Sequence, residues 1–202
     1  MCGMKKKSIC TLKYYNENAQ SFASATASVD FSAIQTRFTT CLPQGGSILD
    51  FGCGSGRDTK YFLSQGYQVT AADGSEELCK LARQYTGIPV EHMLFHELDE
   101  TEQYDCIWAC SSILHLPLEE LIPVLEKMAK ALKPQGIIYT SFKYGNFSGE
   151  RNGRYFTDMT EISFAAVMQN ISSLETEELW ITSDVRPGRG EEKWLNVILR
   201  KK

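Results

Sequence analysis

The most constraining feature of the chain is the segment SILDFGCGSG, residues 47–56, in which a short apolar run gives way to three glycines. The run is too short and too abruptly ended by glycine to form a helix, so it is predicted to be a buried strand. Gly52, Gly54 and Gly56 predict a tight turn, because glycine accepts positive φ and lets a ligand approach the main chain closely. A helix is expected after the turn, in an arrangement that holds a nucleotide-like cofactor through the backbone.

The glycine spacing and one carboxylate indicate which ligand the turn holds. Dinucleotide-binding turns carry the pattern G-x-G-x-x-G and present a helix N-terminus to a pyrophosphate, whereas this turn reads G-x-G-x-G. Asp50 lies two residues before the first glycine, where it would repel a pyrophosphate and attract a ligand that carries an ammonium group. S-adenosylmethionine has an ammonium and a sulfonium group and no phosphate. The turn therefore favours S-adenosylmethionine over NAD.

Four matches in sequence order resemble the motifs of class I S-adenosylmethionine-dependent methyltransferases, beginning with LDFGCGSG itself. The second is Asp73, which ends the predicted strand 67–73 about 20 residues after the first glycine, where nucleotide-binding α/β units hold the ribose hydroxyls. The third is SSILHL, which resembles the family's fourth motif with its trailing histidine, and the fourth is the K-P-x-G turn at 133–136. The resemblance covers residues 47–142.

The resemblance implies an activity and a class of acceptor. The short chain, the amino-terminal segment and the sequence GRYFTDM are similar to small bacterial enzymes that act on small molecules, including the tellurite-resistance type. The Asn/Asp-Pro-Pro-aromatic signature of base methylation is absent, because SSIL stands in its place. Transfer of a methyl group to a small-molecule acceptor, with S-adenosylhomocysteine as product, is therefore implied. A silent domain that binds the cofactor and works through a partner is the alternative.

The resemblance also implies which residues meet the cofactor, since in this family a segment like 11–41 lies across it and the third strand ends at the adenine. The implied cofactor-binding residues are Tyr14, Asp50, Gly52, Cys53, Gly54, Asp73, Gly74, Ser75, Phe95, His96, Cys110 and Ser111. Two alternatives stay open. In the first, Tyr14 and Tyr15 pack with their hydroxyls in water. In the second, Asp73 with Ser75 forms only a turn and a helix N-cap.

The acceptor is expected at the same edge of the sheet, under the segment 143–156, whose length, glycines and aromatic rings favour a lid. Arginine in such a place can hold a carboxylate, so a negative or electron-rich acceptor is expected, with solvated arginines as the alternative. The implied substrate-side residues are Tyr15, Lys143, Arg154, Tyr155, Arg186 and Arg189. His115 is the candidate catalytic residue, as a proton acceptor. Packing under the methionine moiety, or capping of the next helix, is its alternative role.

The alternation of strand and helix patterns predicts the α/β class and a doubly wound, mostly parallel sheet. The resemblance implies a seven-stranded, Rossmann-like methyltransferase fold that ends in an antiparallel strand pair. Further strands are expected at 90–95, 104–111, 136–142, 179–184 and 193–200, and helices at 57–65, 76–85, 117–132 and 160–170. We expect one domain, 1–202, made of a helical cap (11–41), a cofactor-binding core (47–142), and a substrate-side loop with a terminal hairpin (143–202).

Composition excludes several other classes of protein. A net charge of -4 disfavours nucleic acid as a partner, and no apolar run reaches membrane-spanning length. The seven cysteines are scattered without a C-x-x-C pair, so neither disulfides nor a zinc site is indicated, and a cytoplasmic location is expected. His92 and His96 lie four residues apart, but on the predicted strand they would be about 13 Å apart. No metal site is expected.

Overall fold

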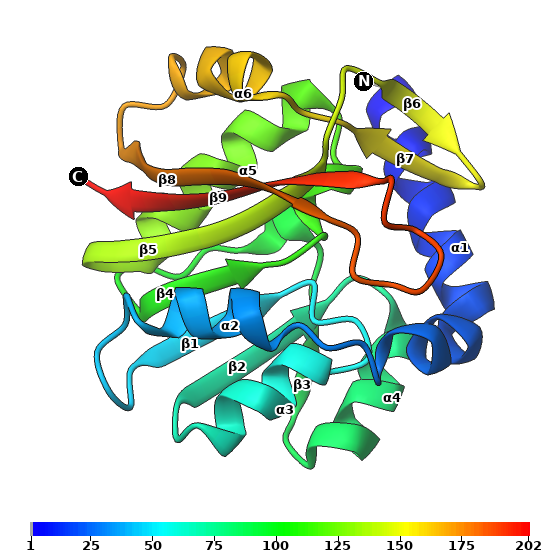
Figure 1. Cartoon of the computed structure of the whole chain (residues 1–202), viewed down its shortest axis with the longest axis horizontal. Coiled ribbons are helices and arrows are strands. Elements are labelled where there is room, and N and C mark those ends of the chain that lie inside the picture. Colours follow the sequence, from blue (N-terminus) through cyan, green and yellow to red (C-terminus); the bar gives the residue numbers. More distant parts are fainter. Residues whose placement is uncertain (1) are drawn as a thin grey trace.

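A computed structural model of the chain describes residues 2–202, with side chains from Ile9 onward, and is built on a central sheet (Figure 1). The sheet has seven strands in the order β3-β2-β1-β4-β5-β9-β8. These are β1 (Ser47–Phe51), β2 (Gln68–Asp73), β3 (Val90–His92), β4 (Tyr104–Ala109), β5 (Leu132–Lys143), β8 (Leu174–Ser183) and β9 (Lys193–Lys201). Strands β1 to β5 pair in parallel, whereas β9 runs antiparallel to both β5 and β8. The predicted fold is confirmed.

Helices cover both faces of the sheet. The α-helices are α1 (Cys2–Thr26), α2 (Ser32–Thr39), α3 (Arg57–Ser64), α4 (Glu76–Thr86), α5 (Leu118–Ala131) and α6 (Glu161–Met168). Two 3-10 turns, η1 (Phe95–Glu97) and η2 (Ile113–His115), follow β3 and β4. Helices α2 and α3 share one hydrophobic cluster with the sheet, and α5 and α6 share another with its opposite face.

The alternation of side chains along the strands explains how one sheet serves two cores. In β1, Ile48 is fully buried in the cluster of α2 and α3, and its neighbour Leu49 is fully buried in the cluster of α5 and α6. Successive strand residues point to opposite faces, so a strand buried on both sides needs a continuous apolar run. The run at the start of the glycine segment meets that requirement.

The strand order places the functional edge. From β1 to β3 the chain builds the sheet in one direction, and β4 then pairs with the other side of β1. In open α/β sheets, ligands bind outside the carboxyl ends of the strands where this reversal occurs. The loops after β1, β2 and β4 therefore meet at one edge.

The segment 143–156 differs from its prediction. Instead of one long loop it forms a hairpin of β6 (Ser148–Arg151) and β7 (Arg154–Thr157), which pair antiparallel in a separate sheet. Asn152 and Gly153 form the two-residue turn, with φ of 50° and 74°. Asn-Gly between two strands is a strong hairpin signal, because both turn positions need positive φ. Figure 1 shows the hairpin beside α1.

Several further boundaries differ. Strand β8 begins at Leu174 and not at the predicted 179, and β5 begins at Leu132, so the predicted turn 133–136 lies within that strand. The predicted strand 90–95 ends at His92, since η1 begins at Phe95 and the backbone N–H of Leu94 donates to the Glu97 carboxylate at 2.7 Å. The cap predicted at 11–41 is two helices: α1 begins at Cys2, and Asp30 accepts the backbone N–H of Ser32 at the start of α2. None of the helices in residues 2–202 combines the length and hydrophobicity needed to cross a bilayer.

The core on the α2 and α3 side is centred on Trp108. Its ring is fully buried and stacks on Tyr139, with ring centroids 4.1 Å apart. The indole N–H donates to the carboxylate of Asp58 at 2.9 Å, and Gln35 donates to the same carboxylate at 2.7 Å. The hydrogen bond satisfies a polar atom that burial would otherwise leave unpaired.

We expect Trp108→Phe to lower the free energy of unfolding by about 1.5–3 kcal/mol for the lost hydrogen bond to the Asp58 carboxylate. The void that the smaller ring leaves should add to this loss. Trp180→Phe, the same change at a half-buried position of β8, should cost less than about 1 kcal/mol. Urea unfolding with an unchanged m-value measures both. Equal losses for the two variants would contradict the central role of Trp108.

Candidate functional site

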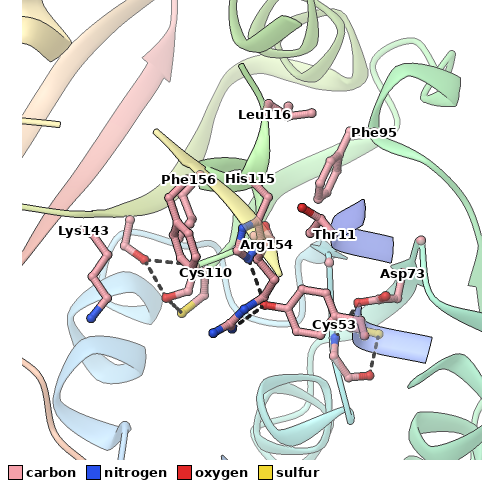
Figure 2. Close-up of a pocket in the computed structure, with 18 of the residues that line it drawn as sticks. Thr11, Cys53, Asp73, Phe95, Cys110, His115, Leu116, Lys143, Arg154 and Phe156 are labelled. Carbon is pink, nitrogen blue, oxygen red and sulfur yellow. Dashed lines mark hydrogen bonds between the residues drawn. The ribbon is translucent and has the colours of Figure 1, made fainter. Parts of the chain in front are cut away.

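A cavity of about 1170 Å³ lies at the carboxyl ends of β1, β2 and β4 (Figure 2). Most of its wall is formed by α1, the glycine turn, the loops after β2, β3 and β4, helix α5, strand β7 and the segment 182–189, with further residues from α3, β5 and β9. Pockets for a drug-sized molecule measure about 300–1,000 Å³. This cavity therefore has room for more than one small ligand.

The glycine turn after β1 is held in place from two sides. The backbone N–H groups of Gly52 and Cys53 both donate to the carbonyl of Ala72, at 2.8 and 3.0 Å. Gly52 has a φ of 86°, and a Cβ on it would lie 2.4 Å from the Cβ of Ser112. The Ser112 hydroxyl in turn donates to the carbonyl of Phe51 at 2.7 Å. Only glycine fits at position 52, because both the backbone angle and the close approach exclude a side chain.

Asp73, at the end of β2, joins the glycine turn to the start of α4. Its two carboxylate oxygens accept the backbone N–H groups of Gly54 at 2.9 Å and Ser75 at 2.8 Å. Burial raises the pKa of Asp73 to about 6, against the lowering effect of these two hydrogen bonds. Each oxygen keeps a second lone pair, and the residue lines the cavity. Asp73 is therefore both a turn residue and an available acceptor for a ligand diol.

Asp50 is placed differently from its prediction. Its carboxyl group is buried behind the turn, accepts the hydroxyl of Thr59 at 2.5 Å, and does not line the cavity. Burial, followed by the negative charge of Asp58, raises the pKa of Asp50 to about 8. Direct attraction of an ammonium group by an exposed Asp50 carboxylate is thus not what this structure presents.

His115 is part of a hydrogen-bonded chain on the cavity wall. Its Nδ1 lies 2.6 Å from the carbonyl oxygen of Tyr155. A carbonyl can only accept, so Nδ1 carries the hydrogen and Nε2 accepts the Tyr15 hydroxyl at 2.8 Å. Burial is the main reason why the pKa of His115 falls to about 4. His115 is therefore neutral at pH 7, and its one free lone pair is engaged by Tyr15.

The comparisons with known proteins agree with this geometry. Residues 48–136 match the family model described as a methyltransferase domain. Residues 48–136 of this chain are a methyltransferase domain. The match begins within β1 and ends in β5, so it includes the glycine turn, Asp73 and His115.

Curated relatives match about half of the chain. The protein YqeM of Bacillus subtilis is 32% identical over 114 residues, which are 50% of this chain and 46% of that protein. The ubiquinone biosynthesis O-methyltransferase of Xanthomonas axonopodis is 29% identical over 106 residues, which are 49% of this chain and 44% of that enzyme. The matched region is therefore less than half the length of these relatives.

Solved structures share the fold over nearly the whole chain. The 1,6-didemethyltoxoflavin-N1-methyltransferase of Burkholderia thailandensis, solved with 1,6-didemethyltoxoflavin and S-adenosylhomocysteine, has a TM-score of 0.79 and 21% identity, covering 100% of this chain and 92% of its own. A TehB-like S-adenosylmethionine-dependent methyltransferase of Corynebacterium glutamicum has a TM-score of 0.67 and 21% identity, covering 95% and 98%. At these identities the likeness concerns the fold.

Most residues predicted to hold the cofactor line the cavity of the methyltransferase domain. They are Gly52, Cys53, Gly54, Asp73, Gly74, Phe95, His96, Cys110 and Ser111. Burial raises the pKa of the Cys110 thiol to about 12, which makes it an uncharged part of the wall. Asp50, Tyr14 and Ser75 do not line the cavity, and the predicted helix N-cap at Ser75 is confirmed. Tyr14 packs under the guanidinium of Arg154, and Ser75 caps α4 by accepting the backbone N–H of Leu78.

The predicted substrate-side residues also divide. Tyr15, Lys143, Arg154, Arg186 and Arg189 line the cavity of the methyltransferase domain. Tyr155 does not, because its hydroxyl shares a hydrogen bond of 2.8 Å with Ser148 across the hairpin. The sequence-based prediction missed Thr11, whose hydroxyl accepts the backbone N–H of Tyr155 at 3.0 Å. Phe156, one of the aromatic residues of the predicted lid, has its ring centroid 4.7 Å from that of His115. Both line the cavity. Thr11 belongs to no recognisable motif, whereas Phe156 lies within the segment GRYFTDM.

We expect Gly52→Ala to weaken binding of S-adenosylhomocysteine by more than about tenfold, because the new methyl group must displace Ser112 and the turn. Gly66→Ala is the matched control. Gly66 has a similar φ of 83°, but a Cβ added to it would meet no atom within 4 Å, so this variant incurs only the backbone strain of about 1–2 kcal/mol. Calorimetric titration of both variants measures the difference. Similar affinities would show that the close approach of Ser112 does not shape the site.

Proposed function

We propose that this protein transfers a methyl group from S-adenosylmethionine to a small-molecule acceptor. The observation that carries the proposal is the pairing of the glycine turn with Asp73 on one wall of a cavity that has room for a second ligand. The methyltransferase family match supports the choice of cofactor. The spare volume favours an enzyme over a silent cofactor-binding domain, because a silent domain has no use for an acceptor space.

The residues on the wall fit S-adenosylmethionine. The turn presents backbone at Gly52 and Gly54 without side chains in the way, and Asp73 keeps lone pairs for the ribose hydroxyls. Met93 and Phe95 provide apolar surface near the end of β3 for a flat ring such as adenine. We infer that the glycine turn lies along the cofactor, that Asp73 holds its ribose, and that Met93 and Phe95 contact its adenine.

When bound, the cofactor supplies an electrophilic methyl group on a sulfonium. The chain's own residues then orient the acceptor and exclude water. Tyr15 and His115 are uncharged at pH 7, since burial raises the pKa of Tyr15 and lowers that of His115. A pair of neutral, mutually bonded groups is suited to positioning, and positioning can supply a large part of the rate enhancement of a two-reactant step. His115 takes up an acceptor proton only if Tyr15 turns away from Nε2.

The first test measures the cofactor and the reaction. We expect calorimetry to show binding of S-adenosylhomocysteine and no binding of NAD. We also expect methyl transfer from isotope-labelled S-adenosylmethionine to at least one member of a panel of small hydroxy, amino and thiol compounds. Binding of NAD without binding of S-adenosylhomocysteine would reject the proposal. Cofactor binding without transfer to any panel member, or to protein partners, would favour the silent domain.

The second test concerns Asp73. Because its pKa is about 6, the ionised form that accepts hydrogen bonds from the ribose is lost as the pH falls through 6, and cofactor affinity should fall with it. We expect Asp73→Asn to weaken binding by about 1.5–3 kcal/mol at pH 8 and to remove this pH dependence. Asp99→Asn, an acid-to-amide change at an exposed site, is the control. A wild-type pH profile in Asp73→Asn would limit Asp73 to a turn role.

The same raised pKa affects stability in the opposite sense. Ionised Asp73 is less favourable in the folded than in the unfolded chain, where the pKa is about 3.9. Its contribution therefore destabilises the ligand-free protein above pH 6 and is relieved as the pH falls from 6 towards 4. Affinity and stability thus respond to Asp73 with opposite signs, which separates a role in ligand binding from a role in folding.

A further inference from the structure

We propose that Arg154 is the anion-binding residue of the acceptor subsite, so that the acceptor carries a carboxylate or a comparable anionic group. The inference rests on the proposed function and narrows it to one substrate class. It is carried by the hydrogen bonds and charges of the cavity wall, which distinguish Arg154 from the other arginines that line it in residues 9–202.

Three other basic groups on the cavity wall already have carboxylate partners. Arg186 forms two hydrogen bonds with Asp184, at 2.9 and 2.5 Å, and Arg189 forms two with Glu192, at 2.5 and 2.7 Å. Lys143 pairs with Glu192 and lies 3.6 Å from Asp184. Carboxylates of the segment 182–192 neutralise these three cations, so this part of the wall presents little net charge to a ligand.

Two further arginines also have carboxylate partners, in contrast to Arg154. On the cofactor side, Arg57 is held by Asp58 through bonds of 2.8 and 2.9 Å. On the hairpin, Arg151 is the cross-strand neighbour of Arg154, and its guanidinium pairs with Asp158 at 2.9 and 2.5 Å. The same hairpin thus carries one arginine with a carboxylate and one without.

Arg154 has one polar contact within residues 9–202. Its Nη1 lies 3.4 Å from the hydroxyl oxygen of Tyr15, and its Nε is buried with no hydrogen-bond partner. A guanidinium has five N–H donors, and leaving a buried donor unpaired is costly. The side chain lines the cavity, so an acceptor atom on a ligand in the cavity is the partner that these donors lack.

Aromatic rings hold the guanidinium of Arg154 in place. Its Cζ lies 4.5 Å from the ring centroid of Tyr14, 5.2 Å from that of Phe156 and 5.7 Å from that of Tyr15. Rings at these distances attract a cation and fix the plane of the guanidinium. They also displace water, and an anion is bound more strongly where water is excluded. The planar fork can then grip a carboxylate with two parallel hydrogen bonds.

The position of Arg154 separates it from the cofactor-binding residues. Figure 2 shows Arg154 next to His115, with Asp73 and Cys53 on one side and Lys143 on the other. Arg154 comes from β7, outside the central sheet, whereas the glycine turn and Asp73 come from the sheet itself. S-adenosylmethionine also carries a carboxylate, however, so the experiment must distinguish the two anions.

The experiment uses the full chain saturated with S-adenosylhomocysteine and titrated with acetate, benzoate and inorganic phosphate, with acetamide and benzamide as neutral analogues. We expect at least one anion to bind and its neutral analogue to fail. Arg154→Met should weaken the anion at least about tenfold, and Arg154→Lys should keep part of the affinity, since it retains the charge without the fork. Arg37→Met, which removes a cation that does not line the cavity, should leave anion binding unchanged.

A second set of titrations determines whether the carboxylate that Arg154 binds belongs to the acceptor or to the cofactor. Affinity for S-adenosylhomocysteine should change less than about threefold in Arg154→Met, a difference below about 1 kcal/mol. If that affinity falls at least about tenfold while affinity for 5′-methylthioadenosine, which lacks the carboxylate, is retained, Arg154 holds the cofactor and the proposal is overturned. Anion binding that is absent from the loaded wild-type protein, or that survives in Arg154→Met, overturns it as well.

The outcomes that overturn the role of Arg154 can be distinguished from failure of the proposed methyltransferase function. If the wild-type protein does not bind S-adenosylhomocysteine, the methyltransferase proposal itself is rejected before any anion is added. Circular dichroism and thermal unfolding accompany each variant. If Arg154→Met does not fold, Arg154→Lys and Arg154→Gln decide the question, because a wild-type anion affinity in a folded Arg154→Gln protein is incompatible with the proposal.

Discussion

The site depends on one half-buried carboxylate that accepts two backbone N–H groups. Asp73 ties Gly54 in the turn after β1 to Ser75 at the start of α4, so two loops from different strands share one anchor. Burial disfavours the ionised form, and the two N–H donors offset part of that cost. The glycine turn keeps its shape because it is fixed at Ala72 and Asp73 together. The remaining walls of the cavity are arranged around that fixed edge.

Much of this edge could be predicted from the sequence because its signals are local. Each signal occupies a short stretch of sequence and reflects a single backbone requirement. The signals are the glycine spacing, the acid at the end of β2 and the alternation of strands and helices. Ile48 and Leu49 are apolar because β1 is covered on both faces, so the strand was predictable from two neighbouring residues. The order of these local strand and helix signals along the chain was enough to predict the fold.

The rest could not be predicted, because it depends on contacts between distant segments. Asp50 was expected to face the ligand, but packing of α3 places Thr59 against it and buries it. Tyr15 and His115 are 100 residues apart, and no pattern in either segment indicates that they meet. The hairpin β6–β7 is the exception, because its turn residues Asn152 and Gly153 are a local signal that can be recognised in the sequence.

The contacts between α1 and hairpin β6–β7 have a consequence for the amino-terminal helix. Thr11 accepts the backbone N–H of Tyr155, and Tyr15 donates to His115 beside Phe156, so the helix is docked on the same structure that closes the cavity. A ligand that touches both α1 and β7 adds its binding free energy to that docking equilibrium. Occupancy of the cavity and resistance of the helix to protease or to hydrogen exchange are thus linked quantities, and each reports on the other.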